Sequence, residues 1–181
     1  MHSINCRQNP VKKVCSSMSI KKKKIYDPQY MTYELFVSGL VKNPLHLRVE
    51  DLQRMELSEV RDLTMLCGSG KEKGIVESYR GVLLRDVLDS ADIILKEHYS
   101  TNQIYIVLKS SEGYRAIFSW HEIYNTAVGD QAIVTFEKNG KPLDEKEGAI
   151  AFISAGDYRP GPRRMRYLQR IEVHEIAAAG E

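Results

Sequence analysis

The sequence contains no apolar run that approaches the length of about 18 residues with which a helix crosses a bilayer, so we expect no membrane span. Its 26 Lys and Arg residues are nearly balanced by 24 Asp and Glu residues, which leaves a formal net charge of +2. Such an even balance lacks the basic excess that is typical of nucleic-acid-binding proteins, and we predict no nucleic-acid partner. The three cysteines, Cys6, Cys15 and Cys67, form no even disulfide framework, so we expect free thiols.

Common catalytic motifs are also missing. The sequence has no GxSxG elbow, no HExxH metal motif and no GxGxxG dinucleotide motif. The stretch Gly68-Ser69-Gly70-Lys71 is similar to part of a phosphate loop but lacks the spacing of that motif. The N-terminal segment lacks the apolar centre of a secretory signal. This predicts a cytoplasmic protein, or a periplasmic one if a leader peptide has been removed.

The length and composition indicate one domain preceded by a tail. The 181 residues, of which 43% are apolar, suffice for a domain with a buried core. Residues 1–28 are rich in Ser, Asn and Lys and show no periodicity, which predicts a flexible basic tail. Residues 29–178 carry the hydrophobic pattern of a globular domain.

Hydrophobic periodicity predicts many short strands and few helices. Alternation indicates strands at 33–38, 45–47, 60–67, 103–108, 114–118, 132–136, 149–153 and 170–176. Helical spacing is found at 49–55 and 82–95, and Ser119 with Glu122 forms a capping box for a short helix. Asn139-Gly140 predicts a tight hairpin turn. Because these elements do not alternate as βαβ units, we predict an α+β fold with a mixed or mainly antiparallel sheet.

Cys67 is the first candidate for chemistry. It ends an apolar strand and precedes a glycine turn, a position from which a side chain can project into a cleft. A thiolate is a soft ligand that suits a transition metal. The alternative is a small buried hydrophobe, which is the usual role of a free cysteine.

A cluster of arginines is the second candidate. A guanidinium group can bind phosphate or carboxylate through two hydrogen bonds, and the glycine among these arginines lets the backbone approach an anion closely. On an extended segment, Arg164 and Arg166 share one face while Met165 and Tyr167 share the other. The alternative is a solvated basic edge strand. The candidate anion or cofactor ligands here are Asp157, Arg159, Arg163, Arg164 and Arg166, with Arg170 completing the cluster.

The single tryptophan, Trp120, is the third candidate. An aromatic face near arginines suits a flat heterocycle, which it would bind by stacking. The alternative is a core tryptophan. The neighbouring His121 fits a helix surface better than acid–base catalysis.

Several motifs, in their order along residues 31–176, resemble the sulfite-oxidase-type molybdopterin-binding domain family. The chain is similar to a small, single-domain member, because it has neither the immunoglobulin-like domain nor the heme domain of the larger enzymes. It also lacks their N-terminal Arg-Asn-His segment. The motifs are LFVSG at 35–39, VKNPL at 41–45, Cys67 with its following glycines, YRGVLLRDVL at 79–88, GYRA at 113–116, NGKPL at 139–143 and GDYR at 156–159.

The resemblance implies an α+β, sulfite-oxidase-like fold around a pterin cleft. It implies molybdopterin, the molybdenum cofactor, with Cys67 as the metal ligand and catalytic residue. It also implies oxygen-atom transfer on a small anionic substrate, with arginines that hold the substrate and the cofactor phosphate. Cofactor-binding residues would be Cys67, Trp120, Asp157, Arg159, Arg163, Arg164 and Arg166.

Two other functions stay open at this point. A smaller branch of the fold is thought to bind a pterin without metal, as a regulatory module that signals to a protein partner. A domain that has kept the fold and lost its ligand is the third reading, and it predicts a pocket filled by side chains instead of an open cleft. Cys67 favours the metal, whereas the missing N-terminal segment favours the metal-free module, so the residues do not decide whether the chain is an enzyme.

Overall fold

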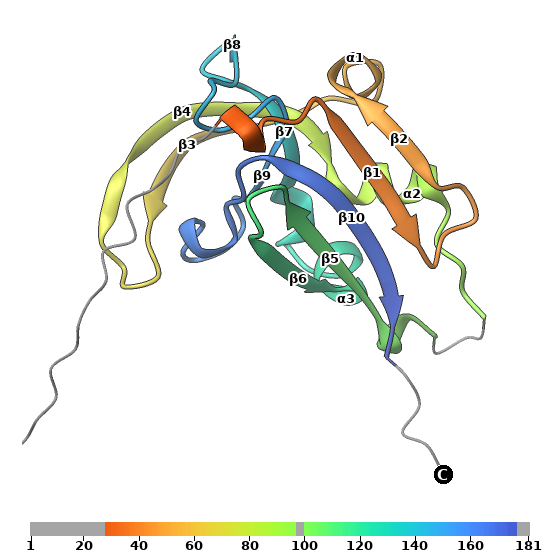
Figure 1. Ribbon diagram of the computed structural model, residues 1–181. Helices are drawn as coiled ribbons and strands as arrows, with labels where there is room; N and C mark the ends of the chain where they lie inside the picture. The colour runs from red at the N-terminus through yellow and green to blue at the C-terminus, as the bar shows by residue number, and fades with distance from the viewer. Residues whose placement is uncertain (1–27, 97–99, 177–181) are drawn as a thin grey trace, which may run out of the picture.

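The computed structural model describes residues 28–96 and 100–176, which form two β-sheets packed against each other with short helices around them (Figure 1). The basic tail predicted at 1–28 lies outside the described residues except for Pro28, and so do Cys6 and Cys15. Within the described ranges, no helix is long and apolar enough to cross a membrane.

The first sheet has five strands in the order β2–β1–β10–β5–β6. The β1–β10 pair is parallel, with Phe36 opposite Arg170, whereas the other neighbours are antiparallel. The strands are β1 (Glu34–Gly39), β2 (Leu45–Arg48), β5 (Ile104–Ser110), β6 (Arg115–Ser119) and β10 (Leu168–Glu175).

The second sheet is antiparallel throughout, in the order β3–β4–β7–β8, with β9 also paired to β7. Its β3–β4 hairpin is long and curved, and its tip extends away from the first sheet (yellow in Figure 1). The strands are β3 (Ser58–Leu66), β4 (Glu72–Leu83), β7 (Ala132–Lys138), β8 (Lys141–Pro142) and β9 (Ala151–Ser154).

The helices are short, and the longest of those described, α2, has eight residues. Ser119 caps α3 as the sequence predicts, because its Oγ accepts a hydrogen bond from the backbone N–H of Glu122 while Glu122 accepts one from the backbone of Ser119. The helical segments are η1 (Pro28–Tyr30), α1 (Val49–Leu52), α2 (Leu84–Ala91), η2 (Ser100–Gln103), α3 (Trp120–Tyr124), η3 (Gly129–Gln131) and η4 (Gly161–Arg163).

The larger hydrophobic core lies between the sheets. Phe118 of β6 and Phe152 of β9 meet there edge to face, with ring centroids 5.4 Å apart. Helix α2 buries Leu84, Val87 and Leu88 in the same core, and all three are fully buried. Each such side chain stabilises the fold by about 1.5–3 kcal/mol.

A second, smaller core lies on the other face of the second sheet. Successive strand residues point to opposite faces. Accordingly, Val134 of β7 belongs to the larger core, whereas its neighbour Ile133 belongs to the smaller one. The smaller core includes Met65 and Tyr79, which also line the cavity described below.

The α+β fold with mainly antiparallel sheets is confirmed, and so are the hairpin at Asn139-Gly140 and the predicted strands. Two differences have physical causes. Hydrophobic alternation does not reveal β4, because its first four residues, Glu72–Ile75, are all exposed. The helix expected at 82–95 is shorter, since it ends where Asp92 adopts a left-handed conformation with φ of 55°.

Candidate functional site

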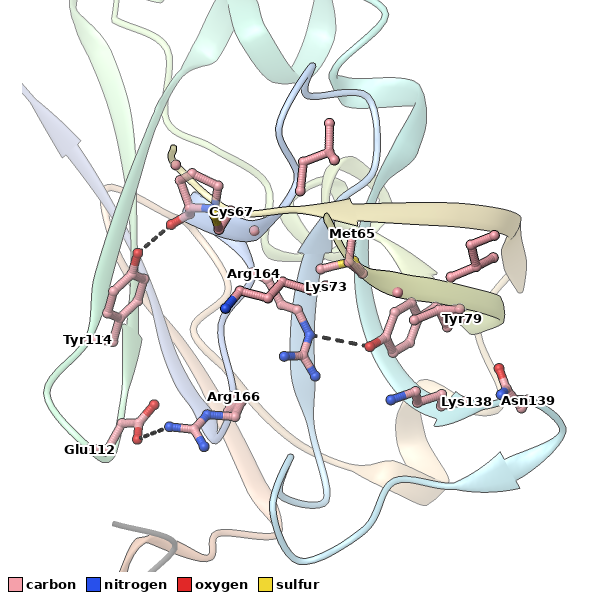
Figure 2. Close-up of a pocket in the computed structure, with 17 residues that line it drawn as sticks. Met65, Cys67, Lys73, Tyr79, Glu112, Tyr114, Lys138, Asn139, Arg164 and Arg166 are labelled. Atoms are coloured by element: carbon pink, nitrogen blue, oxygen red, sulfur yellow. Dashed lines mark hydrogen bonds and ion pairs between the residues drawn. The ribbon is translucent and has the colours of Figure 1, made fainter. Parts of the chain in front are cut away.

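A cavity of about 670 Å³ opens between the β3–β4 hairpin and the arginine-containing segment after η4 (Figure 2). Tyr114, beside the β5–β6 turn, and Lys138, at the end of β7, form further parts of its wall. Four distant stretches of sequence therefore meet at one site. The polar and charged side chains that line it include Cys67, Lys73, Tyr79, Glu112, Lys138, Arg164 and Arg166.

Cys67 lies at the rim of this cavity, directly after β3. Its Sγ is 2.9 Å from Oγ of Ser69, and its carbonyl accepts a hydrogen bond of 2.7 Å from the backbone N–H of Gly70. Gly70 has φ of 80°, a conformation that side chains rarely adopt, which is why a glycine closes this turn. The hydrogen bond from Ser69, backbone N–H groups and the charge of Lys73 lower the pKa of the Cys67 thiol, against the effect of its partial burial.

The cysteine turn is held against the η4 segment. Arg159 donates a hydrogen bond of 2.6 Å from Nη1 to the carbonyl of Gly68, and the hydroxyl of Tyr114 donates one to the carbonyl of Pro162. The backbones touch directly at Gly161, where a Cβ would lie 2.4 Å from the carbonyl oxygen of Leu66. The cysteine turn is thus held by the segment that contains Arg159 and Gly161, and Tyr114 holds that segment in turn through Pro162.

Arg164 lies on the inner wall of the cavity within a charged cluster. Its Nη2 is 2.8 Å from a carboxylate oxygen of Glu147, and its Nε donates to the hydroxyl of Tyr79 at 3.2 Å (Figure 2). Lys138 donates to the other Glu147 oxygen at 2.7 Å. Burial alone would raise the pKa of Glu147, but the charge of Arg164 and the hydrogen bond from Lys138 outweigh burial and keep its pKa below the usual value.

Arg166 occupies another part of the wall, where it forms an ion pair of 2.7 Å with Glu112. The cavity lining and its immediate partners thus bring four cations together with two carboxylates. The excess of two positive charges makes the site attractive to anions. The cations are Lys73, Lys138, Arg164 and Arg166, and the carboxylates are Glu112 and Glu147.

The structure brings three of the predicted site residues together, namely Cys67, Arg164 and Arg166. The predicted alternation also holds around them, since Met165 and Tyr167 point the other way and are buried in the protein. Arg159 does not line the cavity but holds the cysteine turn through Gly68.

Trp120, Asp157 and Arg163 do not line this cavity, so the expected convergence of all the candidates on one concavity is not found. Trp120 packs against the larger core and stacks on Tyr124 at 4.5 Å. Arg163 forms ion pairs with Asp157 and Glu122, and its guanidinium lies 4.1 Å above the ring of Phe118. These charges satisfy one another in a cluster that fastens η4 to α3.

Most residues in or behind the cavity wall were not among the candidates, and four of them show why. Lys138 precedes the Asn139-Gly140 turn, and the turn signal indicates only that it ends a strand. Glu147 reads as an ordinary loop carboxylate. Tyr79 and Lys73 belong to β4, the strand that hydrophobic alternation does not reveal.

The donor set fits a cofactor that carries an anionic group and brings ligands of its own for a metal. Cys67 supplies one soft thiolate donor, and the cations opposite suit a phosphate or another oxyanion. Within residues 28–96 and 100–176, no group of three or more His, Cys, Asp or Glu side chains could hold a bare metal ion.

A strand-end cysteine at a cationic cavity, in a fold of mainly antiparallel sheets, agrees with the resemblance of the sequence to sulfite-oxidase-type domains. The family model of the oxidoreductase molybdopterin-binding domain matches residues 21–180, and the chain belongs to this family. No curated protein sequence matches the chain.

Solved structures support the same fold. The chain is similar to the crystal structure of the sulfane dehydrogenase SoxCD from Paracoccus pantotrophus, with 17% identity and a TM-score of 0.58. The match covers 78% of this chain and 38% of that chain, so the chain spans well under half of the length of that protein. At this identity the likeness concerns the fold alone.

Proposed function

We propose that the chain binds the molybdenum form of molybdopterin in this cavity and acts as an oxidoreductase by oxygen-atom transfer on a small anionic substrate. The observation that carries the proposal is the Cys67 thiol, with its lowered pKa, at the rim of a cavity lined by four cations. A soft anionic donor and fixed cations are the two features that such a cofactor and such a substrate require.

Each wall of the cavity has its own part in this proposal. Cys67 would hold the metal through its sulfur, and Ser69 would orient that sulfur through the 2.9 Å contact. Arg164, Arg166 and the lysines would hold the anionic groups of cofactor and substrate. When bound, the cofactor would supply the redox chemistry of oxygen-atom transfer, which protein side chains do not provide.

The test is the metal and pterin content of protein purified from a host that makes the cofactor. We expect about one equivalent of molybdenum and of pterin per chain, and a loss of most of the molybdenum in Cys67→Ser. Less than about a tenth of an equivalent in the wild type, with no change on substitution, would contradict the enzyme proposal.

The same preparation distinguishes the metal-free regulatory module. A pterin released without molybdenum would favour it, particularly if a reduced pterin raised the Tm of wild type and Cys67→Ala equally. Neither molybdenum nor pterin, together with no thermal response to any reduced pterin, would indicate that the fold has lost its ligand.

A further inference from the structure

Glu147 is a buried carboxylate behind the cavity wall, and only 6% of it is exposed. It lies between β8 and β9 and makes contact with three other elements. These contacts are to Lys138 at the end of β7, to Arg164 after η4, and to Tyr79 of β4. A charge so deeply buried requires partners, and Glu147 has two cations and a hydroxyl.

The two cations are held on either side of this one carboxylate. Lys138 contacts Oε1 at 2.7 Å and Arg164 contacts Oε2 at 2.8 Å. The Tyr79 hydroxyl donates a hydrogen bond to Glu147 at 3.4 Å and accepts one from Nε of Arg164 at 3.2 Å. The guanidinium of Arg164 is therefore held by Tyr79 as well as by Glu147. Without the carboxylate, the two like charges would repel each other and the two long side chains would regain their freedom.

Glu147 also favours the charged form of Lys138. The groups that face the lysine are Glu147, Tyr79 and Arg164, which come from three different elements. Burial lowers the pKa of Lys138, but the hydrogen bond to Glu147 and the charges of Tyr79 and Glu147 together outweigh burial, and the pKa lies above the usual value. If the carboxylate were neutral, burial and the charge of Arg164 would both lower this pKa.

We propose that Glu147 is a positioning residue, which holds Lys138 and Arg164 as a charged pair that binds a tetrahedral oxyanion in the cavity. The inference rests on the proposed function, because it takes this cavity as the ligand site. Two sources share the ligand chemistry, namely the phosphate end of a pterin cofactor and a free oxyanion substrate.

Inorganic sulfate is the probe, since it stays a dianion across the range from about pH 6 to about pH 10 in which a lysine of lowered pKa titrates. Its Kd is measured by calorimetry on the whole chain without cofactor. Wild type should bind sulfate with nearly constant affinity up to about pH 9. Glu147→Gln should lose affinity as the pH rises, by about tenfold between pH 6 and pH 9, because Lys138 becomes neutral.

Glu112→Gln is the matched control, because it removes the same charge from the same cavity. Its partner is Arg166, and because arginine side chains stay charged in proteins, no new pH dependence is expected. If Glu147→Gln gives the same profile as Glu112→Gln, or if wild type does not bind sulfate, the inference is wrong. A merely structural role for Glu147 would change the Tm without creating a pH-dependent Kd.

A second variant keeps the inference testable if Glu147→Gln does not fold. Lys138→Met leaves the pair of Glu147 and Arg164 in place and should weaken sulfate binding by about tenfold at every pH. An unchanged Kd in this variant would also overturn the inference.

Cofactor-loaded protein distinguishes the two sources of the oxyanion. Sulfate binding that is lost on loading assigns the pair to the phosphate end of the cofactor, whereas binding that is retained assigns it to a substrate. Both results support the paired cations. If the protein proves to hold neither molybdenum nor pterin, the proposed function fails while the sulfate titration of empty protein still decides the role of Glu147.

Discussion

Gly161 provides a sharp test of how the cysteine turn is positioned. A Cβ at this residue would lie 2.4 Å from the carbonyl oxygen of Leu66 and 3.3 Å from Cα of Cys67. Normal contact would require the two backbones to separate by about 1 Å. Overpacking of this kind costs about 1–3 kcal/mol. For a chain of this length, about 2 kcal/mol corresponds to a fall in Tm of about 4–8 °C in Gly161→Ala.

Gly68→Ala is the control, because its Cβ would meet only the side chain of Pro162, at an ordinary 3.7 Å. Both substitutions restrict the unfolded chain to a similar extent, so the difference in Tm isolates the clash. The assay combines thermal unfolding with the rate at which Cys67 reacts with a thiol reagent, in protein whose Cys6 and Cys15 are replaced by serine. Equal Tm values and equal thiol rates in the two variants would refute the argument.

Three further predictions concern the charged groups. Arg163→Met should lower the free energy of unfolding by about 2 kcal/mol in urea titrations, because it leaves the carboxylates of Asp157 and Glu122 without their cation. Arg54→Met breaks only an exposed ion pair and should change the free energy of unfolding by less than about 0.5 kcal/mol. Ser69→Ala removes the hydrogen bond that is the largest cause of the lowered pKa of the Cys67 thiol. The pH dependence of Cys67 alkylation in cofactor-free protein should therefore shift to higher pH, and an unshifted pH dependence would contradict this. The pKa of Glu147 in the folded protein lies below its ordinary 4.5, so this carboxylate stabilises the fold above that pH and the stabilisation is lost as the pH falls. Acidification should therefore lower the free energy of unfolding more in wild type than in Glu147→Gln.

Much of the fold could be predicted because its signals are local. Alternation identifies a strand, and Ser119 with Glu122 identifies a capped helix, from a few neighbouring residues. The pairing of β1 with β10 is different, since it joins the two ends of the domain and leaves no local pattern. The start of β4 was likewise hidden, because all four residues of Glu72–Ile75 are exposed and show no alternation of burial.

The site was predictable only in part, for a related reason. Cys67 and Arg164 have a distinctive chemical type and position, and the structure places both at the cavity. Glu147 could not be identified, because its role comes from partners that lie 9 residues away at Lys138 and 68 residues away at Tyr79. Trp120 has a suitable chemical type, but the burial of its ring against the larger core depends on tertiary packing.

The central claim is that the sulfur of Cys67 binds the metal of a cofactor held in the cationic cavity. X-ray absorption at the molybdenum edge, on protein loaded in a cofactor-producing host, tests this bond directly. Wild type should show one more sulfur neighbour around molybdenum than the fraction of molybdenum that Cys67→Ser retains. The same number of sulfur neighbours in both proteins would contradict the claim.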